Sequence, residues 1–134
     1  MFKISLRLVS DDGDPAQVSA ATGMVADHAV RAGDRSIKTG KLYKFSSWSA
    51  SVGPKSGFER PEEAFEELVS WGLPTAYTFR KLKSESNWEI SLVVVQEFRN
   101  TDNPMEKGVS LNTQVIEWIA AAGAGLEIDQ YVYY

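Results

Sequence analysis

The sequence contains no cysteine and only one histidine, His28. Without cysteine there can be no disulfide bond, thiolate metal site or thiol nucleophile. A single histidine also excludes metal sites that need several imidazoles and acid–base devices that use two of them. We therefore expect no catalytic residue, no metal and no cofactor, and a binding protein is favoured over an enzyme.

Long hydrophobic runs are also absent. The longest strongly apolar run covers residues 92–95, whereas a membrane-spanning helix needs roughly 20 residues. Lys3 and Arg7 interrupt the start of the chain, so residues 1–8 contain no apolar stretch typical of a signal peptide. We expect a cytoplasmic protein that does not bind membranes.

The composition is that of one globular domain, residues 1–134, with 43% hydrophobic and 24% charged residues. A net charge of −4 argues against nucleic acid as a partner. The charge is unevenly distributed, because residues 30–58 contain six basic residues and one acidic residue, whereas the rest of the chain contains 8 basic and 17 acidic residues. The sequence therefore predicts a basic segment on an acidic protein.

Hydrophobic periodicity predicts both strands and helices. Residues 2–8 alternate between apolar and polar side chains, which is typical of a half-buried strand. Asp14 and Pro15 indicate the start of a helix that Gly23 ends. Further helices are expected from Pro61 to Gly72 and from the cap Ser110 to Gly123, and further strands at 29–30, 41–51, 76–82, 88–98 and 126–134.

These elements define an α+β fold in the order βαβαββαβ. About five mostly antiparallel strands would form the sheet, with the helices packed on one face. The strands 76–82 and 88–98 would form a hairpin through the polar residues 83–87. Residues 2–6 and 88–92 share three identities in five positions. A ferredoxin-like duplication would explain this internal sequence similarity, and chance similarity between two half-buried strands explains it equally well.

Three segments share features with known sites, and each lacks a necessary part. Residues 11–14 are rich in aspartate but lack the glutamate that completes a calcium loop. Residues 33–42 lack the glycine spacing and the following helix of a phosphate loop. Asp27 and His28 have no Gly-x-Ser-x-Gly nucleophile turn to accompany them. None of these segments predicts a catalytic or metal site.

Two regions are candidates for binding a ligand or partner. The first comprises Arg31, Arg35 and Lys38 of the basic segment, together with Trp48, and suits an acidic protein patch or an anionic ligand. A solvated edge strand that uses lysines against sheet association is the alternative. The second comprises Asp129 and Tyr131 of the tyrosine-rich C-terminal strand. Exposed tyrosines are typical of interfaces, and packing beneath loops is the alternative.

Taken together, these features resemble a family of small bacterial domains of unknown function, DUF4279. The resemblance rests on the first strand, Asp14-Pro15, Thr22-Gly23, the loop with Arg31, Gly33 and Gly40 before the strand bearing Trp48, the acidic second helix, and the ending at 122–131. It implies a stand-alone α+β domain with no established activity, and it supplies no catalytic residues.

The favoured hypothesis is a non-enzymatic domain that binds another protein. By analogy with other small acidic domains, it would act like an immunity protein that neutralises a toxin, with the acidic residues 59–67 covering a basic surface. The alternative is a domain that binds a small anionic ligand, or a minor enzyme, through the basic region 31–44. A third possibility is a homodimer paired through an edge strand.

Overall fold

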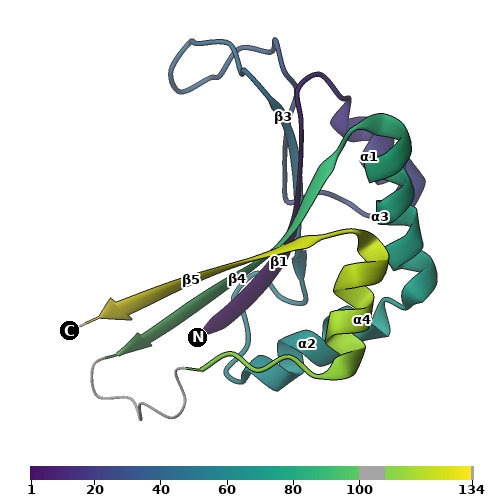
Figure 1. Cartoon of the computed structure of the whole chain (residues 1–134). Coiled ribbons are helices and arrows are strands. Elements are labelled where there is room, and N and C mark those ends of the chain that lie inside the picture. The colour runs from purple at the N-terminus through teal and green to yellow at the C-terminus, as the bar shows by residue number, and fades with distance from the viewer. Residues whose placement is uncertain (100–107, 134) are drawn as a thin grey trace.

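The computed structural model describes residues 1–99 and 108–133. These residues form one sheet with four helices on one of its faces (Figure 1). The elements are β1 (Phe2–Ser10), α1 (Pro15–Thr22), β2 (His28–Val30), β3 (Ser46–Val52), α2 (Pro61–Ser70), α3 (Leu73–Ser86), β4 (Glu89–Arg99), α4 (Thr113–Ala122) and β5 (Gly125–Tyr133). Residues 100–107, most of the polar segment 100–108 that is expected to form a loop before the last helix, and the last residue, Tyr134, lie outside the described residues.

The sheet is open and mixed, with the strand order β2-β3-β1-β4-β5. The pairs β2–β3, β3–β1 and β1–β4 are antiparallel, and β4–β5 is parallel. The expected α+β fold with five mostly antiparallel strands and helices on one face is therefore confirmed. Residues 2–6 lie in β1 and residues 89–92 in β4, which are neighbours in this sheet, but the two similar segments meet only where Leu6 pairs with Leu92.

The expected order βαβαββαβ is wrong at residues 76–82, which belong to helix α3 rather than to a strand. Ala76, Phe79 and Leu82 are buried at intervals of three residues, which is a helical spacing. Pro74 does not block a helix here, because it lies in the first turn of α3, where its missing N–H costs nothing. No hairpin therefore joins this segment to β4.

Local capping explains where the first helix begins and ends. Asp14 Oδ1 accepts a hydrogen bond from the Ala16 N–H at 3.0 Å, and Gly23 adopts a left-handed conformation with φ of 71°. Both expectations are confirmed. At the last helix, Asn112 rather than Ser110 is the cap, since its side chain accepts from the Val115 N–H at 2.9 Å.

The hydrophobic core fills the space between the sheet and the helices. The strands contribute to it because their side chains point alternately to the two faces of the sheet. In β1 and β3, every second residue is buried towards the helices. The residues between them lie on the opposite face of the sheet, which none of the four described helices covers and which is concave in the ribbon (Figure 1). This face carries the half-buried serines Ser5, Ser47, Ser49, Ser51 and Ser91.

Candidate functional site

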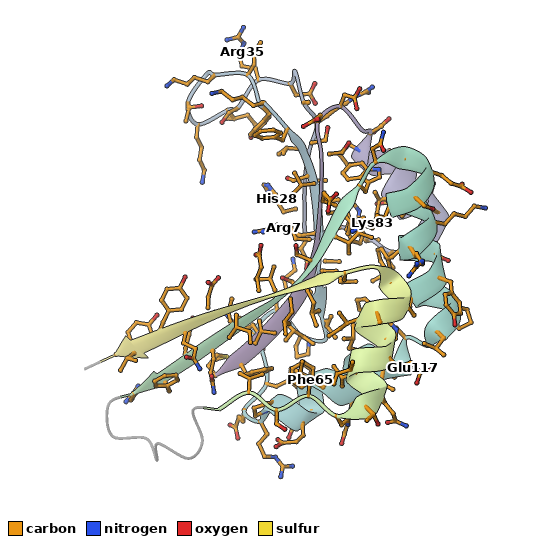
Figure 2. The ribbon with its side chains drawn as sticks, viewed as in Figure 1. Arg7, His28, Arg35, Phe65, Lys83 and Glu117 are labelled. Carbon is orange, nitrogen blue, oxygen red and sulfur yellow. The ribbon has the colours of Figure 1, made fainter. Side chains whose placement is uncertain are left out.

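A hairpin at residues 31–45, which we call the basic hairpin, projects between β2 and β3. It forms because backbone groups pair across it: the Gly33 N–H donates to the Tyr43 carbonyl at 2.9 Å, and the Ser36 N–H donates to the Lys41 carbonyl at 2.8 Å. Gly40 closes the tip with φ of 69°, a conformation that favours glycine. Arg35 lies at the outer end of the hairpin (Figure 2).

Contacts at its base attach the basic hairpin to the rest of the domain. The buried Ser46 accepts a hydrogen bond from the Ala32 N–H at 2.9 Å and donates to the Gly13 carbonyl. Arg31 Nη1 lies 3.7 Å from Asp14 Oδ2, in the cap of α1. The hairpin is thus a structured projection, fixed to the first helix as well as to the sheet.

The positive charge of the basic hairpin is largely uncompensated. Arg31 is paired with Asp14, and the Arg35 guanidinium donates to the Gly40 carbonyl within the hairpin. Lys38, Lys41 and Lys44 are exposed, and none of the three forms an ion pair with an acidic residue in the part of the chain that the structure describes. They are therefore available to an external anion.

Large apolar side chains accompany these lysines. Ile37, at the tip, is fully exposed, and Leu42 and Phe45 are each 55% exposed. The charge pattern pointed to the lysines, but the apolar residues were not predicted as site residues, because Leu42 and Phe45 were assigned to a strand that in fact begins at Ser46. The available signal was the recurrence of an apolar residue among the lysines, at positions 37, 42 and 45.

Trp48 does not belong to this surface, which corrects its place among the candidate binding residues. It is completely buried in β3 on the helix side of the sheet. Its Nε1 donates to Ser19 Oγ at 3.0 Å, and its ring lies 6.1 Å from that of Phe79. The alternation of β3 places Trp48 in the core, so it anchors the strand that follows the basic hairpin.

Asp129 and Tyr131 lie on β5, at the edge of the sheet opposite to β2. The structure therefore separates them from Arg31, Arg35 and Lys38, and the two candidate regions form two surfaces. All nine residues of β5 are exposed, including Tyr131 at 51%. On the concave face, Glu127 of β5 pairs with Arg7 of β1 at 2.7 Å. Arg7 and His28 both point towards this face (Figure 2).

A cluster of acidic residues lies at the other end of the molecule. Helix α2 lies at the end opposite to the basic hairpin (Figure 1) and carries Glu62, Glu66 and Glu67 exposed to solvent. The neighbouring Glu63 pairs with Arg60 at 3.2 Å. The basic hairpin and the acidic helix α2 therefore lie at opposite ends of the molecule, while the other acidic residues are spread over the remaining elements.

A pocket of about 630 Å³ lies where the ends of β1, α3 and α4 meet. Its cations are already engaged: Arg80 donates to the Ala120 carbonyl at 3.2 Å, and Lys83 donates to the Gly123 carbonyl at 3.1 Å. Both therefore neutralise the carboxyl end of α4. Asp11 and Glu89 also line the pocket, so its two positive charges are matched by two negative ones.

Within the described ranges, no group of three histidine, cysteine, aspartate or glutamate side chains is placed to hold a metal ion. Across the same residues, no helix has the length and apolar character that crossing a membrane requires.

Asp27 fixes the start of β2, below the basic hairpin. Its side chain accepts from the Ser51 N–H, its own N–H donates to the Ser49 carbonyl at 2.8 Å, and its Oδ1 lies 3.5 Å from Lys55 Nζ. Hydrogen bonding to Ser51 and, to a smaller extent, the charge of Lys55 hold the pKa of the Asp27 carboxyl below its usual 3.8. Partial burial opposes this shift. The ionised form is thus the one that the fold stabilises.

Replacing Asp27 with asparagine is expected to lower the free energy of unfolding by about 1 kcal/mol near neutral pH. The introduced amide retains an oxygen for the Ser51 N–H but loses the charge. Because the folded-state pKa is depressed, this stabilisation is present above the unfolded pKa and is lost as the pH falls through the folded one. Urea unfolding of the wild type and of Asp27→Asn should show that the difference in their free energies of unfolding becomes smaller below about pH 4. An unchanged difference in acid would contradict a role for the charge.

The fold and these surfaces define a class: a small, open-faced α+β domain with two separate exposed surfaces. The particular family follows from its sequence profile. Residues 1–133 match the family described as a domain of unknown function (DUF4279), and the chain belongs to this family. Neither a search of curated proteins nor a search of solved structures finds a match.

Proposed function

We propose that this domain is a non-enzymatic protein-binding module that contacts an acidic surface of a partner protein through the basic hairpin. The observation that carries the proposal is the presence, on one projecting segment, of exposed Ile37, Leu42 and Phe45 together with three lysines, Lys38, Lys41 and Lys44, that have no ion pair among the described residues. We further propose the setting expected from the sequence, that of an immunity-like bacterial protein of the cytoplasm that neutralises its partner.

The mixture of charge and apolar surface favours a protein as the partner. Lysines alone are ordinary on a solvated surface, whereas clustered exposed apolar side chains rimmed by polar residues are typical of interaction sites. Ile37 would supply apolar area to bury, and the surrounding lysines would supply charge complementarity and faster association. A small anion could use the charge but would leave the apolar area in water.

The basic hairpin is a stronger candidate than the acidic helix α2. The outward face of α2 carries Glu62, Glu66 and Glu67, while its apolar residues Phe65 and Leu68 are buried against the core. A charged face without exposed apolar area is typical of a solvated helix. The hypothesis that residues 59–67 cover a basic partner surface therefore has less structural support than contact through the hairpin.

The backbone of the hairpin is also organised before binding. Cross-strand hydrogen bonds join Gly33 to Tyr43 and Ser36 to Lys41, and the Arg35 side chain donates to the Gly40 carbonyl. A segment that is already ordered loses less conformational entropy when it binds than a flexible loop does. This pre-organisation supports a recognition role for the hairpin.

Replacing Ile37 with serine is expected to weaken partner binding about tenfold. Burying an isoleucine side chain at an interface is worth roughly 1.5–3 kcal/mol, and a factor of ten corresponds to about 1.4 kcal/mol. The thermal stability should be unchanged, because Ile37 is fully exposed. The partner would be captured from native cell extract, identified by mass spectrometry, purified and titrated against both proteins.

The matched control is Val25→Ser, since Val25 is also highly exposed but lies outside the hairpin, before β2. It should bind with wild-type affinity. If Ile37→Ser and Val25→Ser bind alike, the hairpin tip does not contact the partner and the proposal is wrong.

The second candidate function is binding of a small ligand in the pocket near Arg80 and Lys83, which the pocket volume favours. About 630 Å³ falls within the range of small-molecule sites. The balanced charges of its lining do not select an anion, so the basic hairpin is the better supported surface. A thermal-shift screen with neutral and charged metabolites separates the two: a shift that Lys83→Ala abolishes would favour the pocket.

A further inference from the structure

Strand β5 has few of the features that protect the edges of sheets, since its only charged residues are Glu127 and Asp129. It is nine residues long, all of its residues are exposed, and it contains no lysine, arginine or proline. Exposed edges are usually blunted by short strands, by charged residues, especially lysine, or by proline. The opposite edge follows this rule, because β2 has only three residues. In the described part of the chain, no strand pairs with the outer side of β5.

The two faces of β5 differ in chemistry. Pairing with β4 places Leu126, Ile128, Gln130 and Val132 on the helix side of the sheet and Glu127, Asp129, Tyr131 and Tyr133 on the concave side. Leu126, Ile128 and Val132 nevertheless remain 38–44% exposed. The C-terminal half of β5 extends past the helices (Figure 1), so its outer edge is open to a neighbouring strand.

We propose that β5 pairs antiparallel with β5 of a second copy of this chain, in the register that places Gln130 opposite Gln130. The two five-stranded sheets would then form one continuous sheet of about ten strands, with the helices of both copies on the same side. This surface is distinct from the basic hairpin, which would lie at the two far ends of the dimer and stay free for a partner protein.

Charge and apolar complementarity select this register. A two-fold axis perpendicular to the sheet places residues of the same face opposite each other. Such residues are an even number of positions apart along the strand, so the axis passes at one residue, which then lies opposite its own copy. An axis at Asp129 would place two aspartates directly opposite each other, which is unfavourable. An axis at Ile128 would place Glu127 opposite Asp129 of the second copy, which is unfavourable for the same reason.

With the axis at Gln130, every cross-strand pair is compatible. Ile128 lies opposite Val132 of the second copy, so the apolar residues on the helix side face each other. Asp129 lies opposite Tyr131, and Glu127 lies opposite Tyr133, so each carboxylate faces a phenol that can donate a hydrogen bond. Residues 127–133 of both strands take part, whereas moving the axis to Tyr131 would shorten the pairing to residues 129–133. The strand is thus complementary to itself.

The absence of native cysteine allows a direct test of the register. Directly opposed residues in an antiparallel pair have Cα atoms about 4.5–5.5 Å apart, which a disulfide can bridge, whereas diagonal neighbours are about 7–8 Å apart. Under mild oxidation, Gln130→Cys is expected to form a disulfide-linked dimer at least tenfold faster than Asp129→Cys. Glu66→Cys, on exposed α2, gives the rate of random collision. Circular dichroism checks the fold of each variant, because Gln130 also donates to Gln96 at 2.9 Å.

Sedimentation equilibrium of the unmodified chain is the second measurement. A dimer that dissociates on dilution is expected, since seven paired residues bury less surface than stable complexes do. Ile128→Lys should shift the protein towards monomer by placing a lysine on the edge. A monomer at all concentrations, or a dimer that Ile128→Lys leaves intact, would overturn the proposal. Faster crosslinking of Asp129→Cys than of Gln130→Cys would overturn the register.

Discussion

Replacing Trp118 with alanine is expected to lower the free energy of unfolding by about 3–5 kcal/mol. Trp118 is buried in α4, with its ring centroid 6.0 Å from that of Trp71 and 6.3 Å from that of Phe79. Its Nε1 donates to the Gly72 carbonyl at 3.0 Å, at the turn between α2 and α3. Alanine would therefore leave a cavity at the junction of three helices and remove the hydrogen bond to that turn. Urea unfolding followed by far-UV circular dichroism measures the loss.

Two control variants separate the contributions at this position. Trp118→Phe keeps an aromatic ring but removes the indole N–H, so a smaller loss of roughly 1–3 kcal/mol is expected from the reduced volume and the lost hydrogen bond to the Gly72 carbonyl, which keeps the bond from the Ala76 N–H. Ile116 lies on the same helix, and its side chain is 52% exposed. Ile116→Ala should therefore change the free energy of unfolding by less than about 1 kcal/mol. Equal effects of Trp118→Ala and Ile116→Ala would show that Trp118 does not hold the helices together.

Several features of the fold could be predicted because local chemistry determines them. Asp14 and Pro15 mark the start of α1, and Gly23 marks its end, since capping depends on residues within one turn of the helix. The alternation of residues 2–8 likewise identified β1, because one face of that strand is buried and the other is not. These signals need no knowledge of the rest of the chain.

Residues 73–86 could not be assigned from local preference. Thr75, Tyr77 and Phe79 favour strands, and the contacts with α4 and α1 that stabilise α3 come from residues far away in the sequence. The spacing of Ala76, Phe79 and Leu82 was the correct signal, and it was outweighed by the aromatic and β-branched residues between them. Tertiary packing here overrides local strand preference.

Among the candidate binding residues, too, some could be recognised from local sequence, whereas others depended on the tertiary structure. Arg31, Arg35 and Lys38 were found from charge alone, because a basic segment on an acidic chain is visible in the sequence. Trp48 was misplaced, because whether a strand residue faces the core depends on the register of β3 against β1. Ile37 was missed, because exposure of an isoleucine depends on the hairpin projecting away from the sheet.

The largest effect on binding is expected from reversing the charge of Lys38, Lys41 and Lys44 together to glutamate. Affinity for an acidic partner should fall about 100-fold, which corresponds to about 2.7 kcal/mol. Opposed like charges at an interface cost several kcal/mol. In the described part of the chain the three lysines form no ion pair, so their replacement breaks no ion pair within the domain. For the same reason, the stability of the isolated domain should change little.

The measurement is a titration of the purified partner at low and at moderate salt. Binding of the wild type should weaken as salt rises, because screening reduces attraction between exposed charges. The triple variant should instead bind weakly at low salt and gain affinity as screening relieves the repulsion. The matched control replaces Glu62, Glu66 and Glu67 on α2 with lysine. This changes the net charge by the same amount in the opposite direction, at the opposite end of the molecule.

This control distinguishes local contact from overall charge. If the net charge of −4 alone governed association with an acidic partner, the α2 variant would bind much more tightly and the hairpin variant more weakly, by similar factors. Contact through the hairpin instead predicts a large loss for the hairpin variant and a small change for the α2 variant. A large loss in the α2 variant would show that the acidic helix, rather than the basic hairpin, meets the partner.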